Sequence, residues 1–318
     1  MSAVENAYRF LEGGDAQAAI AELERAGDAG DASSFLELAV WNLEGRLVPR
    51  DLHRSRDYFR RSGDLGQTTA EHVYICFLAN GVGGAADWQA ANDRLRKLAQ
   101  TDGRAARQIE LVDVMQITAD GYPLTVPEGR RLSASPEAHR FEALFSPAEC
   151  DYLVQTAEPL LQQSVVVDPA TGVLRPHPVR TSDGASFPWA SEDLVISALN
   201  RRIAAASGTD VKCGEPLQVL RYRPGQEYRP HFDALPSNEN QRVLTMLVYL
   251  NSGYSGGETS FTRAGLTVAG RMGDALLFRN ARPGGSPDLN AEHAGLPVSS
   301  GEKYLASRWI RERPMIAT

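Results

Sequence analysis

Residues 217–233 read LQVLRYRPGQEYRPHFD, and residues 293–309 read HAGLPVSSGEKYLASRW. The first stretch ends on His231 and Asp233, and the second starts at His293 and runs through Lys303. If residues 231–233 are extended, His231 and Asp233 point to the same face and can reach one metal ion. Two imidazoles and one carboxylate hold a non-haem iron(II) on one face and leave its other positions open.

The second stretch contains an expected strand that starts at Lys303. Alternation along this strand places four side chains on one face: Lys303, Leu305, Ser307 and Trp309. A lysine on an inward face needs an anionic partner, because an unpaired buried ammonium is unfavourable. The distal carboxylate of 2-oxoglutarate would supply one. The alternative is a surface lysine whose stem covers apolar groups.

The His231–Asp233 pair is weak evidence when it is taken alone. With six histidines in 318 residues, such a pair arises by chance in roughly one of three chains of this composition. A surface histidine and aspartate therefore remain the alternative until other residues join the pair.

From about Ser135 onward, short β-rich runs alternate with turn signals. A helix is expected over about 147–161, with Ser146 as N-cap and Glu149 at the capping-box position. A second helix is expected near 192–207, closed by Gly208. Strands are expected at 217–222, 243–250, 257–261, 266–268, 275–278 and 303–310. Many short antiparallel strands with two flanking helices predict a double-stranded β-helix, or jelly roll.

Residues 1 to about 118 follow a different pattern, with apolar residues at helical spacing. Three segments end alike: IAELERAGDAG at 20–30, RDYFRRSGDLG at 56–66 and NDRLRKLAQTDG at 92–103. Gly30, Gly66 and Gly103 are spaced by 36 and 37 residues, and Gly45 and Gly81 by 36. A glycine after each run suits a helix C-terminus. The pattern predicts stacked helix–turn–helix pairs, an α-solenoid that resembles the Sel1-like branch of the tetratricopeptide repeats.

The expected fold class is thus α+β, with a helical repeat domain at 1–118, a linker at 119–134 and a jelly-roll domain at 135–318. The repeats either dock a partner or only brace the second domain. Net charge is −7 with a pI near 5.5, which argues against nucleic-acid binding. No apolar run is long enough for a membrane span. Three widely spaced cysteines, Cys76, Cys150 and Cys213, favour a reducing compartment, with the cytoplasm as the default.

From about Phe141 to the C-terminus the chain resembles the catalytic domain of prolyl 4-hydroxylases. Besides the two opening stretches, the matching strings are LFSPAECDYLVQTAEPLL (144–161), VVDPATGVLRPHPVRTSDG (166–184), RVLTMLVYLN (242–251), GGETSF (256–261) and GDALLFRN (273–280). They cover more than half of the chain and occur in the order that the family has.

The resemblance implies an iron(II)- and 2-oxoglutarate-dependent dioxygenase that hydroxylates an unactivated C–H bond, most simply the 4-position of a prolyl residue in a peptide or protein. His231, Asp233 and His293 would be the catalytic iron ligands. Lys303 would bind 2-oxoglutarate, helped by Tyr222 and Thr259. The side chains expected on the substrate side are Tyr228, Arg242 and Trp309. The implied cofactors are Fe(II), 2-oxoglutarate and O2, with ascorbate as a further candidate, and residues 165–189 match a loop that folds over bound peptide.

Two alternatives stay open at this point. The pocket residues do not distinguish a prolyl peptide from a free amino acid or another small molecule. The chain could also be a non-catalytic repeat scaffold or ligand sensor with an oxygenase-like domain. Iron-dependent conversion of 2-oxoglutarate to succinate separates the second alternative from an enzyme.

Overall fold

The computed structural model describes residues 2–167, 174–176, 179–236, 239–282 and 284–315. The chain divides into two compact units, one containing residues 1–121 and 189–197 and the other residues 122–188 and 198–316. The break after Gly121 falls inside the stretch expected as a linker, 119–134, and that stretch also contains β1 (Arg130–Ala134). Each unit is described below by itself.

The first unit carries seven helices within residues 2–121. These are α1 (Ala3–Glu12), α2 (Ala16–Asp28), α3 (Ala32–Glu44), α4 (Leu52–Asp64), α5 (Thr68–Asn80), α6 (Trp88–Leu98) and α7 (Gly103–Val114). Each helix packs against the next one along the chain, as a helical solenoid requires. Across the part of the chain that the structure describes, no helix combines the length and the apolar character that crossing a bilayer demands.

The helix ends explain the 36-residue period. Asp15, Asp51 and Asp87 are the N-caps of α2, α4 and α6, and each side chain accepts a hydrogen bond from a backbone amide of the first turn. Gly45 and Gly81 end α3 and α5 in the left-handed conformation that glycine adopts without strain. The helical repeat is therefore confirmed in its period and its glycine caps.

One of the expected helix ends is wrong. Gly30 and Gly66 have φ values of 102° and 90° and follow their helices as expected. Gly103 instead begins α7, and the side chain of Asp102 caps that helix. In the segment QTDG the aspartate is a strong N-cap, so the helix starts where the repeat alignment placed an end.

The second unit is built on an eight-stranded antiparallel sheet. Its order is β1, β2 (Glu137–Phe141), β13 (Ala275–Arg279), β9 (Arg242–Tyr249), β16 (Lys303–Arg311), β7 (Leu217–Tyr222), β6 (Asp183–Phe187) and β3 (Gln162–Gln163). A smaller antiparallel sheet has the order β12 (Leu266–Val268), β11 (Thr259–Phe261), β14 (His293–Gly295) and β8 (Tyr228–His231). Two short pairs complete the strands, β10 (Ser255–Gly256) with β15 (Val298–Ser300) and β4 (Val165–Val167) with β5 (Leu174–Pro176).

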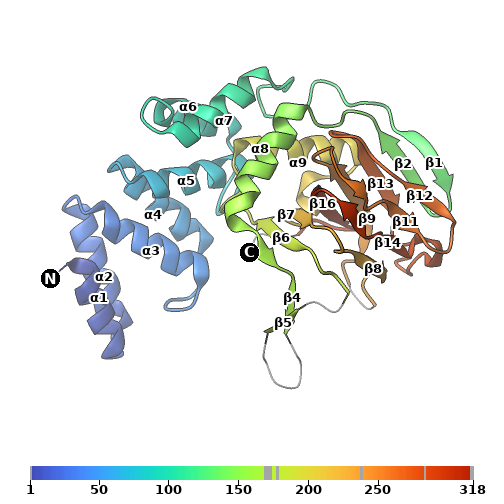
Figure 1. The fold of residues 1–318 in the computed structure, drawn as a ribbon. Coiled ribbons are helices and arrows are strands. Elements are labelled where there is room, and N and C mark those ends of the chain that lie inside the picture. Colours follow the sequence, from blue (N-terminus) through green and yellow to red (C-terminus); the bar gives the residue numbers. More distant parts are fainter. Residues whose placement is uncertain (1, 168–173, 177–178, 237–238, 283, 316–318) are drawn as a thin grey trace. The chain divides into compact units, whose positions relative to one another are not determined.

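The two sheets face each other and form the double-stranded β-helix that the sequence predicts (Figure 1). Their shared core contains Leu247 and Leu305 from the larger sheet and Phe261 from the smaller one, with Tyr249 and Phe278 beside them. Burying each such side chain contributes roughly 1.5–3 kcal/mol of transfer free energy. This core fixes the distance between the sheets, and the site lies between them.

Helices flank the strands of this unit. They are α8 (Pro147–Ala157), α9 (Leu194–Ser207) and the short 3-10 helices η1 (Glu158–Leu160), η2 (Val211–Cys213) and η3 (Leu289–Ala291). Ser146 and Glu149 form the expected capping box at the start of α8. Glu149 is buried and pairs with Arg202 at 2.6 Å, which ties α8 to α9.

Candidate active site

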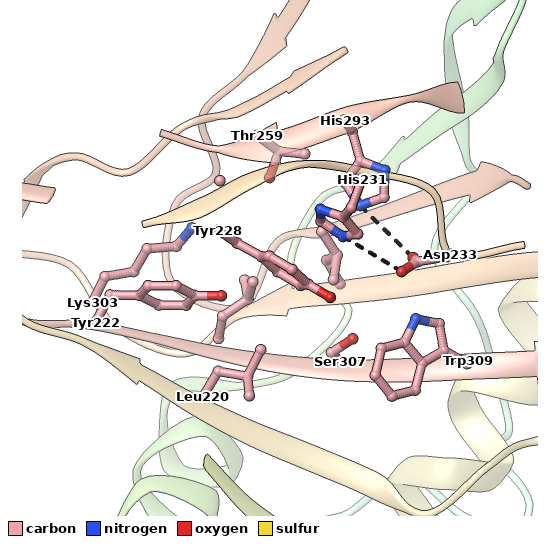
Figure 2. Close-up of a pocket in the computed structure, with 13 residues that line it drawn as sticks. Leu220, Tyr222, Tyr228, His231, Asp233, Thr259, His293, Lys303, Ser307 and Trp309 are labelled. Carbon is pink, nitrogen blue, oxygen red and sulfur yellow. Dashed lines mark ion pairs between the residues drawn. The ribbon is translucent and has the colours of Figure 1, made fainter. Parts of the chain in front are cut away.

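A cluster of two histidines and one aspartate lies between the two sheets (Figure 2). His231 on β8 and His293 on β14 are direct partners across the antiparallel pairing of these strands. Their ring centroids are 4.3 Å apart. Asp233 follows two residues after His231, and one ligand atom from each of the three residues lies within 4.8 Å of the others. Sheet pairing thus brings together two histidines that are 62 positions apart in the sequence.

Backbone carbonyls set the orientation of both imidazole rings. His231 Nδ1 lies 2.8 Å from the carbonyl oxygen of Arg229, and His293 Nδ1 lies 3.0 Å from that of Ala291. A carbonyl can only accept, so each Nδ1 carries a proton, and Nε2 is the nitrogen of each ring that faces the cluster. These Nε2 atoms point to Asp233, at 3.6 Å from Oδ1 for His231 and 3.7 Å from Oδ2 for His293.

Asp233 is 5% exposed and remains ionised. Burial by itself raises the pKa of its carboxyl, but the facing His293 and His231 and a hydrogen bond from Thr245 outweigh this effect and hold the pKa well below its usual range. Burial lowers the pKa of His293, which favours the neutral ring. A buried carboxylate beside two imidazoles is a donor set for a divalent cation.

The residues present fit an iron(II) ion. His231 Nε2 is buried and has no hydrogen-bond partner among the described residues, which is unusual for a buried polar atom. A metal ion would satisfy this nitrogen together with those of His293 and Asp233. Three ligands on one side leave the other coordination positions free for a co-substrate and dioxygen. We call this cluster the metal end of the pocket.

A buried lysine forms the opposite end of the same pocket, the lysine end. Lys303 is 2% exposed, and its Nζ donates to the carbonyl oxygen of Gly257 at 2.6 Å. The rings of Tyr222 and Tyr249 are each 5.5 Å from Nζ. Burial lowers the pKa of Lys303 to about 8, although nearby Glu258 opposes the shift. Within the described ranges, no carboxylate forms an ion pair with this ammonium, so the lysine end suits an anionic ligand.

Gly257 allows the close contact with Lys303. Its φ is +71°, and a Cβ added there would lie 3.1 Å from both Lys303 Cδ and Val298 Cγ2. Any other residue would strain the backbone and push against the lysine stem. Gly257 of the GGET string therefore forms the part of the pocket wall that contacts the Lys303 side chain.

Tyr222 and Thr259 line the pocket together with Lys303. Tyr222 is the direct register partner of Lys303 across β7 and β16, and burial raises the pKa of its phenol. Thr259 is 2% exposed, and its Oγ1 lies 3.5 Å from the hydroxyl of Tyr249. The lysine end thus offers one ammonium and several hydroxyl groups.

The three residues expected on the substrate side are placed differently from one another. Tyr228 and Trp309 line the pocket, and the ring of Tyr228 stacks on His231 with 3.5 Å between centroids. Trp309 Nε1 is buried without a hydrogen-bond partner in the part of the chain that the structure describes. Arg242 does not line the pocket: it binds Glu215 through two hydrogen bonds of 2.6 and 2.8 Å, and its guanidinium covers the Trp309 ring at 3.8 Å.

The pocket holds about 430 Å³, part of it open to solvent, and its other walls are mostly apolar. The remaining lining residues are Leu220, Leu247, Gly295, Leu305 and Ser307. The four side chains that alternation placed on one face of β16 all line it. Residues 168–173 and 177–178 of the expected loop 165–189 lie outside the described residues.

Sequence reasoning missed three polar residues at the two ends of the pocket. Thr245 donates to Asp233 at 2.6 Å, Asn280 donates to Thr245 at 2.8 Å, and the hydroxyl of Tyr249 lies near Thr259. Thr245 interrupts the otherwise apolar run in RVLTMLVYL, which is a usable signal, because a polar residue in a buried strand needs a partner. Asn280 stands at the end of a strand, where asparagine is common, so its sequence position gives no signal.

Comparisons with known proteins agree with this geometry. The sequence model of the 2OG-Fe(II) oxygenase superfamily matches residues 217–311, which include all three members of the cluster and Lys303. This match, like the jelly roll and its metal end, indicates the class of 2OG-Fe(II) oxygenases.

Close relatives give the family. The chain is 37% identical over 203 residues to probable prolyl 4-hydroxylase 3 of Arabidopsis thaliana, covering 56% of this chain and 70% of the relative. It is 38% identical over 201 residues to prolyl 4-hydroxylase 1 of the same plant, covering 57% and 71%. The chain belongs to the prolyl 4-hydroxylase family. A solved structure of the viral collagen prolyl hydroxylase of Paramecium Bursaria Chlorella virus-1 aligns with 55% of this chain and 95% of its own, at 29% identity and a TM-score of 0.45.

The chain is therefore an iron(II)- and 2-oxoglutarate-dependent dioxygenase, and Fe(II), 2-oxoglutarate and O2 are its cofactor and co-substrates. The expectation of an enzyme of this class is confirmed.

Proposed function

We propose that this protein hydroxylates a prolyl residue, at its 4-position, in a peptide or protein. The observation that carries the proposal is a pocket with a metal-ligand set at one end and, at the other, a buried ammonium that forms no ion pair within the described residues. The relatives' names support the prolyl substrate, since both are called prolyl 4-hydroxylases.

In this proposal His231, Asp233 and His293 hold the iron through the two Nε2 atoms and the carboxylate. When bound, iron and 2-oxoglutarate together supply the oxidising power for hydroxylation. Lys303 binds the distal carboxylate of 2-oxoglutarate, and the hydroxyls of Tyr222 and Thr259 add hydrogen bonds. Charge-assisted hydrogen bonds of this kind fix the diacid in one direction between the two ends.

The substrate side is proposed to use Tyr228 and Trp309 directly. Tyr228 covers one face of His231, and Trp309 points an N–H into the pocket that has no partner among the described residues and would donate to a substrate carbonyl. Arg242 would act on substrate through the indole that its guanidinium covers. The apolar walls keep water from the reacting atoms.

The direct test is mass spectrometry of prolyl peptides after incubation with the full chain, Fe(II), 2-oxoglutarate and oxygen. We expect a gain of one oxygen atom on proline, together with succinate. Asp233→Ala should abolish both products, because a ligand is lost from the ion. Full turnover by that variant would refute the ligand assignment.

A free amino acid or another small molecule is the alternative substrate, and free proline and other amino acids belong in the same assay. Hydroxylation of free proline with no reaction on peptides would replace the peptide proposal. The scaffold or sensor alternative predicts binding of 2-oxoglutarate without any succinate, with or without peptide.

The helical repeats are proposed to form a separate domain, residues 1–118, that docks a protein substrate or partner. The second domain is proposed to span 135–318. A pull-down with the full chain and with the isolated repeats tests this proposal. If the full chain recovers a bound protein and the repeats recover none, the repeats only brace the second domain.

A cytoplasmic location is proposed from the cysteines, which are all free and buried: Cys76, Cys150 and Cys213. Ascorbate is proposed as an additional cofactor on the family resemblance. Turnover that is identical with and without ascorbate over many cycles would remove it from the scheme.

A further inference from the structure

A buried line of hydrogen bonds ends on the aspartate of the metal end. Thr245 Oγ1 donates to Asp233 Oδ2 at 2.6 Å, and Asn280 Nδ2 donates to Thr245 Oγ1 at 2.8 Å. The exposed fractions of these residues are 5%, 0% and 2% for Asp233, Thr245 and Asn280. All three belong to the second unit, on or beside β8, β9 and β13.

The direction of this line is determined by its first member. Thr245 donates its single hydroxyl proton to Asp233 Oδ2, so this proton is not available to Asn280. The oxygen of Thr245 can then only accept from its other neighbour, which requires the NH2 group of Asn280. Asn280 Oδ1 is left without a partner among the described residues. Turning the amide over would point that oxygen at Thr245, where it would compete for the proton that Asp233 receives.

The backbone holds both residues of the line in place. Thr245 lies in the middle of β9, opposite Phe278 on one side and Trp309 on the other. Asn280 donates its backbone amide to Val243 and accepts from Asp288 through its carbonyl. These backbone bonds fix the Cα positions from which the two side chains extend, and both side chains are buried.

The hydrogen bond distinguishes the two oxygens of the carboxylate. Both oxygens face an imidazole, Oδ1 that of His231 at 3.6 Å and Oδ2 that of His293 at 3.7 Å, but among the described residues only Oδ2 also accepts a hydrogen bond, from Thr245. We propose that Thr245 and Asn280 are positioning residues that fix the rotation of the Asp233 carboxylate, so that Oδ1 alone binds the metal. Single-oxygen binding keeps free the coordination position that a two-oxygen carboxylate would occupy. This inference rests on the proposed role of Asp233 as an iron ligand.

The test measures metal affinity and needs no turnover. The full-length protein, stripped of metal, is titrated with Co(II) by calorimetry. Thr245→Val keeps the shape and removes the hydroxyl, and we expect its Kd for Co(II) to rise about 10-fold or more, in the range usual for groups that orient a metal ligand. Thr245→Ser restores the hydroxyl, and its Kd should stay within about 3-fold of the wild-type value.

Asn280→Leu tests the outer member. It should weaken Co(II) binding less than Thr245→Val does, and in the double variant it should add nothing, because Asn280 acts only through Thr245. Thr209→Val is the matched control: it removes a hydroxyl that is hydrogen-bonded to Ser207, outside the pocket. Should Thr245→Val fail to fold, Asn280→Leu and Thr245→Ser carry the test.

The outcomes separate this inference from the proposed function. Wild-type Co(II) affinity in folded Thr245→Val and Asn280→Leu, together with a large loss in Asp233→Ala, would overturn the positioning role and leave the ligand assignment intact. Wild-type Co(II) affinity in Asp233→Ala itself would overturn the ligand assignment. The positioning role of Thr245 and Asn280, which rests on that assignment, would then be overturned as well.

Discussion

At the metal end of the pocket the buried charge of Asp233 faces two imidazoles and accepts a hydrogen bond from a hydroxyl, whereas at the lysine end the ammonium of Lys303 contacts a carbonyl oxygen and aromatic rings. The ligand groups of the metal end are held in place by the protein itself, and they suit a cation. The lysine end keeps a buried positive charge that forms no ion pair with any carboxylate of the described residues, although Glu258 is nearby. The difference indicates that the lysine end is completed only when the co-substrate brings its carboxylate.

The largest expected effect tests the metal end. His293→Ala should weaken Co(II) or Fe(II) binding by about 100-fold or more, because a ligand is lost outright rather than reoriented. Calorimetric titration of the metal-free protein measures it. His139→Ala, at the only other histidine on a strand of the described second unit, is the control and should bind metal like the wild type. Equal affinity in the two variants would place the metal elsewhere.

Lys303→Met tests the lysine end. Losing a charge-assisted hydrogen bond of roughly 1.5–3 kcal/mol should raise the KM for 2-oxoglutarate about 10- to 100-fold. The affinity for Co(II) should stay unchanged, because the lysine does not touch the cluster. Lys212→Met, at an exposed lysine of the same unit, is the control. A Lys303→Met variant with an ordinary KM would mean that the diacid binds elsewhere.

The same variant should be more stable than the wild type when no co-substrate is present. The pKa of Lys303 is lowered from 10.5 to about 8, so the unfolded chain holds this proton more tightly than the folded one. The penalty is full below pH 8, amounts to at most roughly 3 kcal/mol, and disappears as the pH rises towards 10.5. Denaturant unfolding should show a gain from Lys303→Met that is several-fold larger at pH 7 than at pH 10. A gain of equal size at both values would point to packing instead of charge.

The lowered pKa also predicts a pH dependence of co-substrate binding. The groups around the ammonium are Glu258, Tyr222 and Tyr249. Because only the protonated amine attracts the carboxylate, the affinity for 2-oxoglutarate should fall about tenfold between pH 7 and pH 9. Lys303→Arg keeps its charge over this range and should lose the trend. A slope that persists in the arginine variant would have to come from another group.

The smallest effect is expected for Thr259→Val. Its hydroxyl would contribute one neutral hydrogen bond, worth roughly 0.5–1.5 kcal/mol, so the KM for 2-oxoglutarate should rise about 2- to 10-fold. Thr267→Val, on the partly exposed β12 that pairs with the same strand, is the control. An effect as large as that of Lys303→Met would show that Thr259 also supports the fold.

How far the sequence predicts this molecule depends on whether the signal is local. Strands 217–222 and 266–268 match their expected bounds to the residue, because alternation and flanking turns are local. The inward face of β16 was likewise predictable from alternation. The aspartate caps at 15, 51 and 87 repeat every 36 residues, and they would have identified helix starts better than the glycines did.

Contacts between distant segments were harder to predict. The partner of Thr245 is fixed by the pairing of three strands, which no local pattern states. The same holds for Arg242, whose side chain binds Glu215 and covers Trp309, where the resemblance suggested a place along the pocket. The family resemblance predicted the three residues of the cluster, but it did not predict the groups that hold them in position.

The two histidines of the metal end owe their orientation to carbonyl oxygens of Arg229 and Ala291, each two residues earlier in the chain. Every amino acid has such an oxygen, so no side-chain replacement at position 229 or 291 can delete it. The orientation of the two imidazoles is therefore insensitive to substitutions at these positions. The orientation of the Asp233 carboxylate, in contrast, depends on Thr245, which a single base change can replace.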